Sequence, residues 1–456
     1  MPSDDGGRDN AEYLAALRLL EAEIEGDLTR RIVPGLSIAV IHGADPVWAR
    51  GFGHTDLAAG TPAEAETIYA VGSITKLFTA TMLMQLRDAG RLRLDDPVQD
   101  YLPDIKVPRR HPGAAQITFR HLVTHTSGLT KDAPVPYWDR GENFPPVERL
   151  MALLAQTEQP YPPGVQWKYS NLAIALLGFT LQRIAGQAWD AYVTERILAP
   201  IGMTATAPRL AEWQRGRLAT GYARPAGAWP PEVLAHQDLG GISAGGSMQS
   251  SVVDMAKFAA QQWEAAPAVL AGDSIREMHR PIWVNEDWQS GQGIGWQVRR
   301  ATDGRTRIEH GGGVHGFTCK LLVSVPDRLG VAVFTNGSDG KVGTTIATRA
   351  LDLLAPAARR IVARGRVVAP APPAWARYAG RYRWVLGDAE VVRSSGVLSL
   401  IVPKDLGWET VELVAEGEHA FRMLGGQVRG ELLRFVVDDD GGVRRAWIGP
   451  HPHDRI

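Results

Sequence analysis

The stretch that decides the fold is SITKLFTATMLMQLRDAG, residues 73–90. Apolar side chains fall on almost every face of this stretch, which predicts a buried helix rather than a surface one. The helix is expected to end at Gly90, because glycine is favoured just beyond a helix C-terminus. Ser73 and Lys76 stand three residues apart at the start, so their side chains share one face of the first turn.

This pair meets the requirements of a nucleophile beside a base. Free N–H groups and the dipole at a helix start stabilise the negative charge that develops on Ser73 during attack. Lys76 lies in an apolar wall, where lost solvation should lower the pKa of its amine toward that of a usable base. A second Ser-x-x-Lys, Ser338 to Lys341, is expected in a glycine-containing loop without a helix. The first copy is therefore the candidate.

A second polar group, Tyr169-Ser170-Asn171, follows roughly 100 residues later, between Pro162-Pro163-Gly164 and an apolar helix. A buried tyrosine is commonly a core residue with a satisfied hydroxyl. The functional interpretation is a phenol within reach of Ser73 that relays a proton, with Asn171 orienting the amide of a substrate. Taken alone, the triplet leaves both interpretations open.

The third group is His310-Gly311-Gly312-Gly313, which directly precedes an expected strand from Phe317 to Val325. Glycines without side chains let a substrate backbone approach a strand edge closely. The backbone N–H of Gly313, together with that of Ser73, could form an oxyanion hole. The alternative is a plain glycine-rich bend.

In their order and spacing, the three motifs resemble the β-lactamase-like serine hydrolase superfamily, which includes the penicillin-binding proteins. Tyr169-x-Asn171 is similar to the class C β-lactamase branch, with its D-aminopeptidases, D,D-peptidases and related esterases. The resemblance extends from residue 12 to about residue 355 and includes His125-Thr-Ser-Gly-Leu129.

The resemblance implies an α/β fold, in which an antiparallel sheet is flanked by helices and carries an all-α subdomain. It implies three catalytic residues, Ser73, Lys76 and Tyr169. It also implies residues that bind the substrate or the oxyanion: Asn171, His310, Gly312 and Gly313. The expected activity is hydrolysis of amide or ester bonds in small substrates, such as peptides, through an acyl-enzyme on Ser73.

One departure from the family pattern concerns substrate choice. β-Lactamases and D,D-peptidases usually carry lysine, followed by Thr-Gly, where this chain has His310. Histidine has an ordinary pKa of about 6.5, and the nearby charge of Lys76 should disfavour its protonated form further. We therefore expect a neutral His310, no anchor for a penicillin carboxylate at this position, and poor β-lactamase activity.

The domain organisation follows from changes in composition along the chain. Residues 1–360 are expected to form the hydrolase domain, with its α/β part at about 10–110 and 240–360 and its helical part at about 111–239. A proline-rich linker is expected at 361–374. Residues 375–456 alternate in polarity between Gly and Asp turns, which predicts a small all-β domain. This tail resembles the lipocalin-like barrel attached to some peptidases of the family.

Composition excludes several classes of protein. The 456 residues carry a net charge of −1, so the broad positive field of a nucleic-acid-binding protein is missing. Cys319 is the single cysteine, which rules out an intrachain disulfide. The N-terminus has no apolar signal segment and no apolar run is long enough to span a bilayer. We expect a cytoplasmic protein without metal or cofactor and without membrane contact; an oligomer is compatible with the sequence.

Two other catalytic motifs compete with Ser73. Gly241-Ile-Ser243-Ala-Gly245 matches the nucleophile elbow of α/β-hydrolases, but no convincing strand precedes it. His121 and His125 have the spacing of a zinc pair, but the glutamate that normally follows the first histidine is missing.

Two further alternatives keep the same fold. One is a catalytically inactive sensor or binding protein, which the presence of Ser73, Lys76 and Tyr169 disfavours. The other is an acyltransferase or peptide cyclase, in which an amine or alcohol replaces water as the acceptor; the sequence does not separate this chemistry from hydrolysis.

Overall fold

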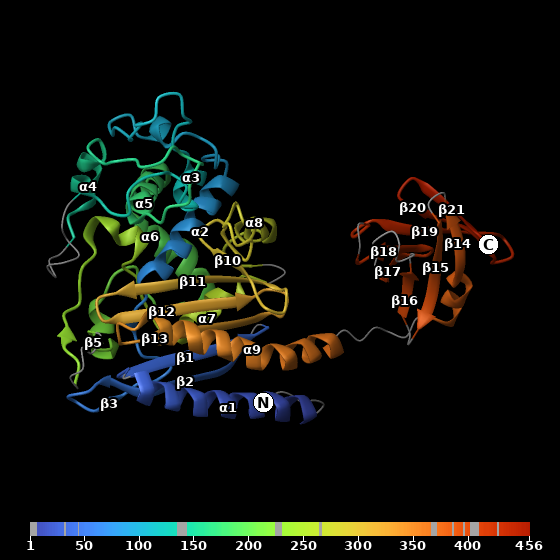
Figure 1. Ribbon diagram of the computed structural model, residues 1–456, viewed down its shortest axis with the longest axis horizontal. Coiled ribbons are helices and arrows are strands. Elements are labelled where there is room, and N and C mark those ends of the chain that lie inside the picture. The colour runs from blue at the N-terminus through green and yellow to red at the C-terminus, as the bar shows by residue number, and fades with distance from the viewer. Residues whose placement is uncertain are drawn as a thin grey trace. The chain divides into compact units, whose positions relative to one another are not determined.

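A nine-stranded sheet forms the base of the first of two units, Met1–Ile361, in the computed structural model (Figure 1). All of its pairings are antiparallel, and the strand order is β3-β2-β1-β13-β12-β11-β10-β9-β8. The bounds are β1 (Gly35–His42), β2 (Asp45–Asp56), β3 (Thr61–Pro62), β8 (Trp283–Val284), β9 (Ser290–Gln292), β10 (Gln297–Arg300), β11 (Thr306–Val314), β12 (Phe317–Ser324) and β13 (Leu329–Thr335).

The structure describes most of the chain. The described residues are 7–31, 33–43, 45–134, 144–223, 230–263, 267–365, 372–384, 387–394, 397–401, 410–425 and 428–456.

The two faces of the sheet carry separate apolar cores. Successive side chains of a strand point to opposite faces, and β1 follows this rule. Leu36, Ile38 and Val40 pack with α1 and α9 on one face. Ala39 and Ile41 join the larger core on the other face, which contains α2, α5 and α7. Helices therefore cover both faces, as Figure 1 shows.

Helices account for most of the remaining structure of this unit. The longer ones are α1 (Gly7–Arg31), α2 (Thr75–Asp88), α3 (Phe119–Val123), α4 (Val147–Leu154), α5 (Asn171–Ala185), α6 (Trp189–Val193), α7 (Val252–Ala260), α8 (Gly272–Met278) and α9 (Gly340–Gly365). Short turns are η2 (Gly72–Ile74), η3 (Val98–Tyr101), η4 (Thr194–Leu198), η5 (Ala199–Ile201), η6 (Glu212–Arg217) and η7 (Gly240–Gly245). Among the described residues, no helix has both the length and the apolarity needed to cross a bilayer.

Two short strand pairs complete this unit. β4 (Tyr69–Ala70) pairs with β7 (Gln249–Ser250), and β5 (Gly221–Tyr222) pairs with β6 (Val233–Leu234). The second pair lies inside the segment 111–239, which therefore contains a small hairpin in addition to its helices.

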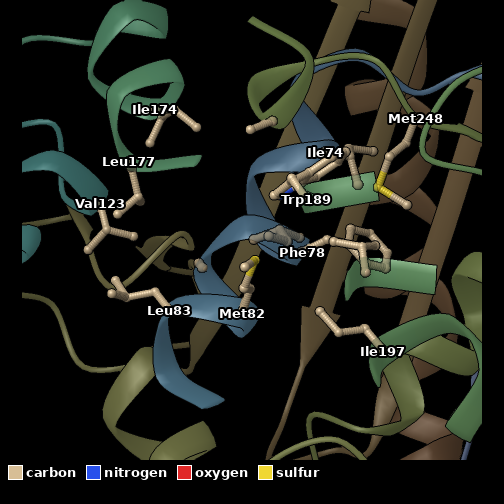
Figure 2. Close-up of a cluster of buried hydrophobic side chains, with 14 of the residues drawn as sticks. Ile74, Phe78, Met82, Leu83, Val123, Ile174, Leu177, Trp189, Ile197 and Met248 are labelled. Carbon is tan, nitrogen blue, oxygen red and sulfur yellow. The ribbon is translucent and has the colours of Figure 1, made fainter. Parts of the chain in front are cut away.

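The helix α2 lies at the centre of the larger core, as the sequence predicts. Figure 2 shows Phe78, Met82 and Leu83 of this helix among side chains from several other elements. Those neighbours include Val123, Ile174, Leu177, Trp189, Ile197 and Met248. Each large apolar side chain buried in this way stabilises the fold by about 1.5–3 kcal/mol, so α2 and the turn before it are firmly held.

The second unit, Val362–Ile456, contains a closed barrel of eight antiparallel strands. The strands are β14 (Gly380–Trp384), β15 (Gly387–Ser394), β16 (Val397–Ile401), β17 (Val411–Gly417), β18 (Ala420–Met423), β19 (Leu432–Val437), β20 (Val443–Ile448) and β21 (His451–Arg455), preceded by the turn η8 (Pro373–Tyr378). Tyr378, Tyr382, Phe421 and Phe435 meet inside it. The expected α/β fold followed by an all-β barrel is confirmed.

The structure corrects the start of the expected linker. Helix α9 continues to Gly365 with Pro356 inside it, so residues 361–365 are helical. The alanine- and leucine-rich sequence has high helix propensity. Leu354, Ala357 and Ala358 around the proline are buried against the sheet, which offsets the one backbone hydrogen bond that a proline removes. Residues 366–371, within the rest of this segment, lie outside the described part of the chain.

Candidate active site

Ser73 lies in the turn η2, directly before α2, and its hydroxyl oxygen contacts the other two predicted catalytic side chains. It accepts a hydrogen bond from Lys76 Nζ at 3.0 Å and another from the Tyr169 hydroxyl at 2.8 Å. The structure thus brings together the three residues that the sequence predicts as catalytic, although Tyr169 is 96 residues away from Ser73 along the chain.

Lys76 is held in place beneath Ser73 by the turn η7. Its side chain is only 2% exposed. Its ammonium donates a second hydrogen bond to the carbonyl oxygen of Gly245 at 2.7 Å and lies 5.1 Å from the ring centre of Tyr169. The hydroxyl of Thr79 bonds the neighbouring carbonyl of Ala244 at 2.6 Å. These contacts fix the lysine and the turn relative to α2.

The ring of Tyr169 packs against His125, a neighbour that the sequence reasoning did not place in the site. The two ring centres are 4.4 Å apart. The Nδ1 atom of His125 accepts a hydrogen bond from the Ser170 N–H at 3.3 Å. Burial, and then the charge of Lys76, hold the pKa of His125 well below its usual range. A neutral imidazole therefore supports the tyrosine; the His-Thr-Ser-Gly-Leu segment at 125–129 was the signal that could have found it.

Asn171 begins helix α5 and forms one corner of the site with Lys131 and Asp132. Ser170 caps the helix by accepting the Ala173 N–H at 2.9 Å, as serine commonly does at this position. The Asn171 side-chain amide donates to Asp132 Oδ1 at 2.9 Å, and its backbone N–H donates to the carbonyl oxygen of Lys131 at 2.7 Å. The sequence reasoning missed Lys131 and Asp132.

A cavity of about 240 Å³ opens beside Ser73. Its lining comes from η2, α5, η7 and β11. The lining residues are Gly72, Ser73, Lys131, Tyr169, Asn171, Leu239, Ile242, Gly245, Gly246 and Gly313. Of the seven residues predicted for the site, four border this space, Lys76 lies beneath Ser73, and His310 and Gly312 are not in the lining.

Gly312 and Gly313 differ in what surrounds them. A Cβ atom on Gly312 would lie 1.9 Å from the carbonyl oxygen of Val71, so this glycine lets β11 pack directly against the chain before η2. A Cβ atom on Gly313 would meet nothing within 4 Å. Gly312 is therefore a packing residue, whereas Gly313 faces open space beside the nucleophile.

His310 is buried and does not line the cavity. Its side chain is 2% exposed, and Nδ1–H donates to the Gly311 carbonyl oxygen at 2.7 Å. Burial, and to a smaller extent the charge of Lys76, lower the pKa of His310 to about 3. The imidazole is neutral at pH 7, as expected from the sequence, but its burial does not fit the expected role in substrate binding.

The two competing catalytic motifs do not form the geometry they need. Ser243 lies in η7, where its hydroxyl donates to the Gly240 carbonyl, and it borders a different cavity from Ser73. Helix α3 ends at Val123, so His121 and His125 do not share a helix face. The Nδ1 atoms of the two histidines accept from different backbone amides, those of Thr118 and Ser170.

Comparison with known proteins agrees with the fold. The Beta-lactamase family model matches residues 20–355. Penicillin-binding protein 4 of Amycolatopsis lactamdurans is 29% identical over 320 residues, which cover 68% of this chain and 82% of the relative.

Solved structures extend the likeness. The octameric penicillin-binding protein homologue from Pyrococcus abyssi aligns with a TM-score of 0.65 at 26% identity, covering 96% of this chain and 99% of that one. A class C β-lactamase from Rhodobacter sphaeroides shares the fold, with a TM-score of 0.61 at 22% identity, over 73% of this chain and 98% of its own. The chain belongs to the β-lactamase family.

Proposed function

We propose that this protein is a serine hydrolase that cleaves amide or ester bonds of small substrates through an acyl-enzyme on Ser73. One observation carries the proposal: the Ser73 hydroxyl oxygen contacts both Lys76 Nζ and the Tyr169 hydroxyl within hydrogen-bonding distance, at the edge of a cavity. A nucleophile that touches two proton-transfer groups is the arrangement that acyl transfer requires.

The first half of the reaction forms the acyl-enzyme. Ser73 attacks the substrate carbonyl carbon while its hydroxyl proton passes to the Lys76–Tyr169 pair, since a neutral amine or a phenolate has a lone pair to receive it. The amides of Ser73 and Gly313 stabilise the negative charge on the carbonyl oxygen. The carbonyl–leaving-group bond then breaks, and the same pair returns the proton to the leaving amine or alcohol.

The second half releases the product. Water gives a proton to the Lys76–Tyr169 pair and attacks the acyl carbon, and the proton returns to Ser73 as the ester bond breaks. Asn171 binds the substrate amide, with its own side chain held by Asp132. No metal or cofactor takes part in this scheme.

The size and polarity of the cavity favour a small peptide, amide or ester. A volume of about 240 Å³ is at the low end for a small-molecule site. The buried, neutral His310 offers no cation to a penicillin carboxylate, so hydrolysis of penicillins is expected to be slow compared with that of esters or aminoacyl amides.

Covalent labelling tests the proposal. Intact-mass spectra after incubation with a fluorophosphonate or an activated ester should show one adduct in the wild type. The adduct should be lost in Ser73→Ala and kept in Ser243→Ala, the matched control for the competing serine. Lys76→Ala and Tyr169→Phe should each slow labelling at least about 100-fold, without additive effects in the double variant.

The remaining outcomes separate the alternatives. An adduct that persists in Ser73→Ala would disprove the assignment of the nucleophile. Failure of the wild type to react would favour a binding protein without catalysis.

A further inference from the structure

The charged side chains that line the cavity are of one sign, positive, among the residues that the structure describes. Among the described residues that line it, Lys131 has the one basic side chain, and none is a carboxylate. Lys76, immediately beneath the lining, adds a second basic group. The nearest acidic side chain along the chain, Asp132, already accepts a hydrogen bond from Asn171.

Lys131 has a fixed backbone and an unpaired ammonium. Its carbonyl oxygen accepts the N–H groups of Asn171 and Leu172 at 2.7 and 3.2 Å, so the start of α5 holds the residue in place. The side chain is exposed, and within the described part of the chain its ammonium has no ion-pair or hydrogen-bond partner. A cation that is anchored but unpaired at the wall of a cavity is available for a ligand.

The wall contributed by β11 offers no such group. Gly313 has no side chain, and His310 is buried, bonded to the Gly311 carbonyl and absent from the lining. A negatively charged group in this cavity would therefore be recognised by the corner that contains Lys131 and Asn171.

We propose that Lys131 is a specificity residue, which makes the enzyme prefer substrates with a carboxylate a few atoms from the carbonyl that Ser73 attacks. This inference rests on the proposed acyl-enzyme function and adds the substrate class to it: acidic amides or esters rather than neutral ones. The four-carbon side chain of lysine carries its charge well away from the backbone, which suits a carboxylate separated from the reacting carbonyl by a short spacer.

The test compares two substrates that differ only in charge, the p-nitrophenyl half-ester of adipic acid and its methyl ester. The quantity measured is the ratio of kcat/KM for the acidic substrate to kcat/KM for the neutral one. An exposed ion pair is worth up to about 1 kcal/mol, so Lys131→Met should lower this ratio about fivefold. Lys131→Glu should lower it further, and added salt should lower the wild-type ratio toward that of Lys131→Met.

Lys168→Met is the matched control, because Lys168 lies beside Tyr169 in the sequence but does not line the cavity. Its ratio should equal that of the wild type. A ratio unchanged in Lys131→Met and Lys131→Glu would overturn the proposal, even if both substrates reacted more slowly.

Ser73→Ala separates this inference from the function on which it rests. Loss of hydrolysis in that variant, with an unchanged ratio in the Lys131 variants, would refute only the role of Lys131. Hydrolysis that survives in Ser73→Ala would refute the acyl-enzyme function, and the role of Lys131 with it.

Discussion

At the scale of single residues, the site combines a buried lysine with two buried histidines. Lys76 is buried near His125 and His310, and burial together with the charge of Lys76 lowers the pKa of both imidazoles. In the mechanism proposed here, proton transfer at Ser73 is therefore assigned to Lys76 and Tyr169 and not to either imidazole. The neutral state of these rings has a measurable effect on stability.

The pH dependence of stability provides a test of the His310 environment. The pKa is about 3 in the folded protein and about 6.5 in the unfolded chain. Between these values the unfolded chain binds the proton, so the stabilisation is complete above about pH 6.5 and is lost as the pH falls toward 3. One such group contributes at most about 1.4 kcal/mol per pH unit.

His310→Gln should therefore lose stability less steeply than the wild type between pH 6.5 and 4. The measurement is the free energy of unfolding by urea at several pH values in this range. His54→Gln, which changes an exposed histidine, serves as the control and should follow the wild type. Parallel curves for His310→Gln and the wild type would contradict a buried, neutral imidazole.

At the scale of elements, the contact between β11 and η2 determines where the nucleophile lies. The glycine at 312 lets the strand approach Val71 so closely that a side chain would collide with the backbone. A collision with backbone atoms cannot be relieved by a rotamer change, so main-chain atoms must shift.

Gly312→Ala and Gly313→Ala form a matched pair that tests this contact. We expect Gly312→Ala to destabilise the first unit by about 1–3 kcal/mol and to lower its melting temperature by several degrees. Gly313→Ala should melt like the wild type, because its Cβ would meet no atom within 4 Å. Thermal unfolding followed by circular dichroism distinguishes the two; equal melting temperatures would show that the strand and the turn are not in tight contact.

Elements with regular patterns were predictable from the sequence, and contacts made by irregular loops were not. Helix α2 was predictable because its side chains are apolar on almost every face, and the strand after the glycines because most of its residues are apolar. Lys131 and Asp132, which lie beside the predicted Asn171, were missed because a loop without periodicity brings them there. Residues 361–365 were expected in the linker but continue α9, because burial of the residues around Pro356 keeps the helix intact past the proline.

The orientation of β11 limited what could be predicted about the site. The sequence indicates that a glycine-rich strand is near Ser73, but not which of its residues face the cavity. A shift of one residue reverses the faces of a strand. His310 was therefore expected in the cavity and is found in the interior, while Gly313 borders the cavity as expected.

At the scale of the whole molecule, the two units have separate apolar cores. The cores of the first unit include no residue from the barrel, and the barrel core contains residues from Tyr378 onward. We therefore propose that each unit folds by itself.

Calorimetry tests this independence. The full chain should unfold in two transitions, and a chain that ends after Gly365 should keep the transition of the first unit at the same temperature within about 2 °C. A single transition in the full chain, or a truncated chain that does not fold, would show that the barrel is needed for the stability of the first unit.

The strand order also sets the time at which the site can exist during synthesis. The strand β1 needs β13 as its second neighbour, with Leu36 opposite Thr335. The cavity likewise needs Gly313 of β11, about 240 residues after Ser73. At about 5–20 residues per second, a ribosome takes about 12–48 s to cover that distance. A nascent chain thus carries Ser73, Lys76 and Tyr169 long before it carries Gly313, and the proposed catalysis can begin only after β11 and β13 have joined the sheet.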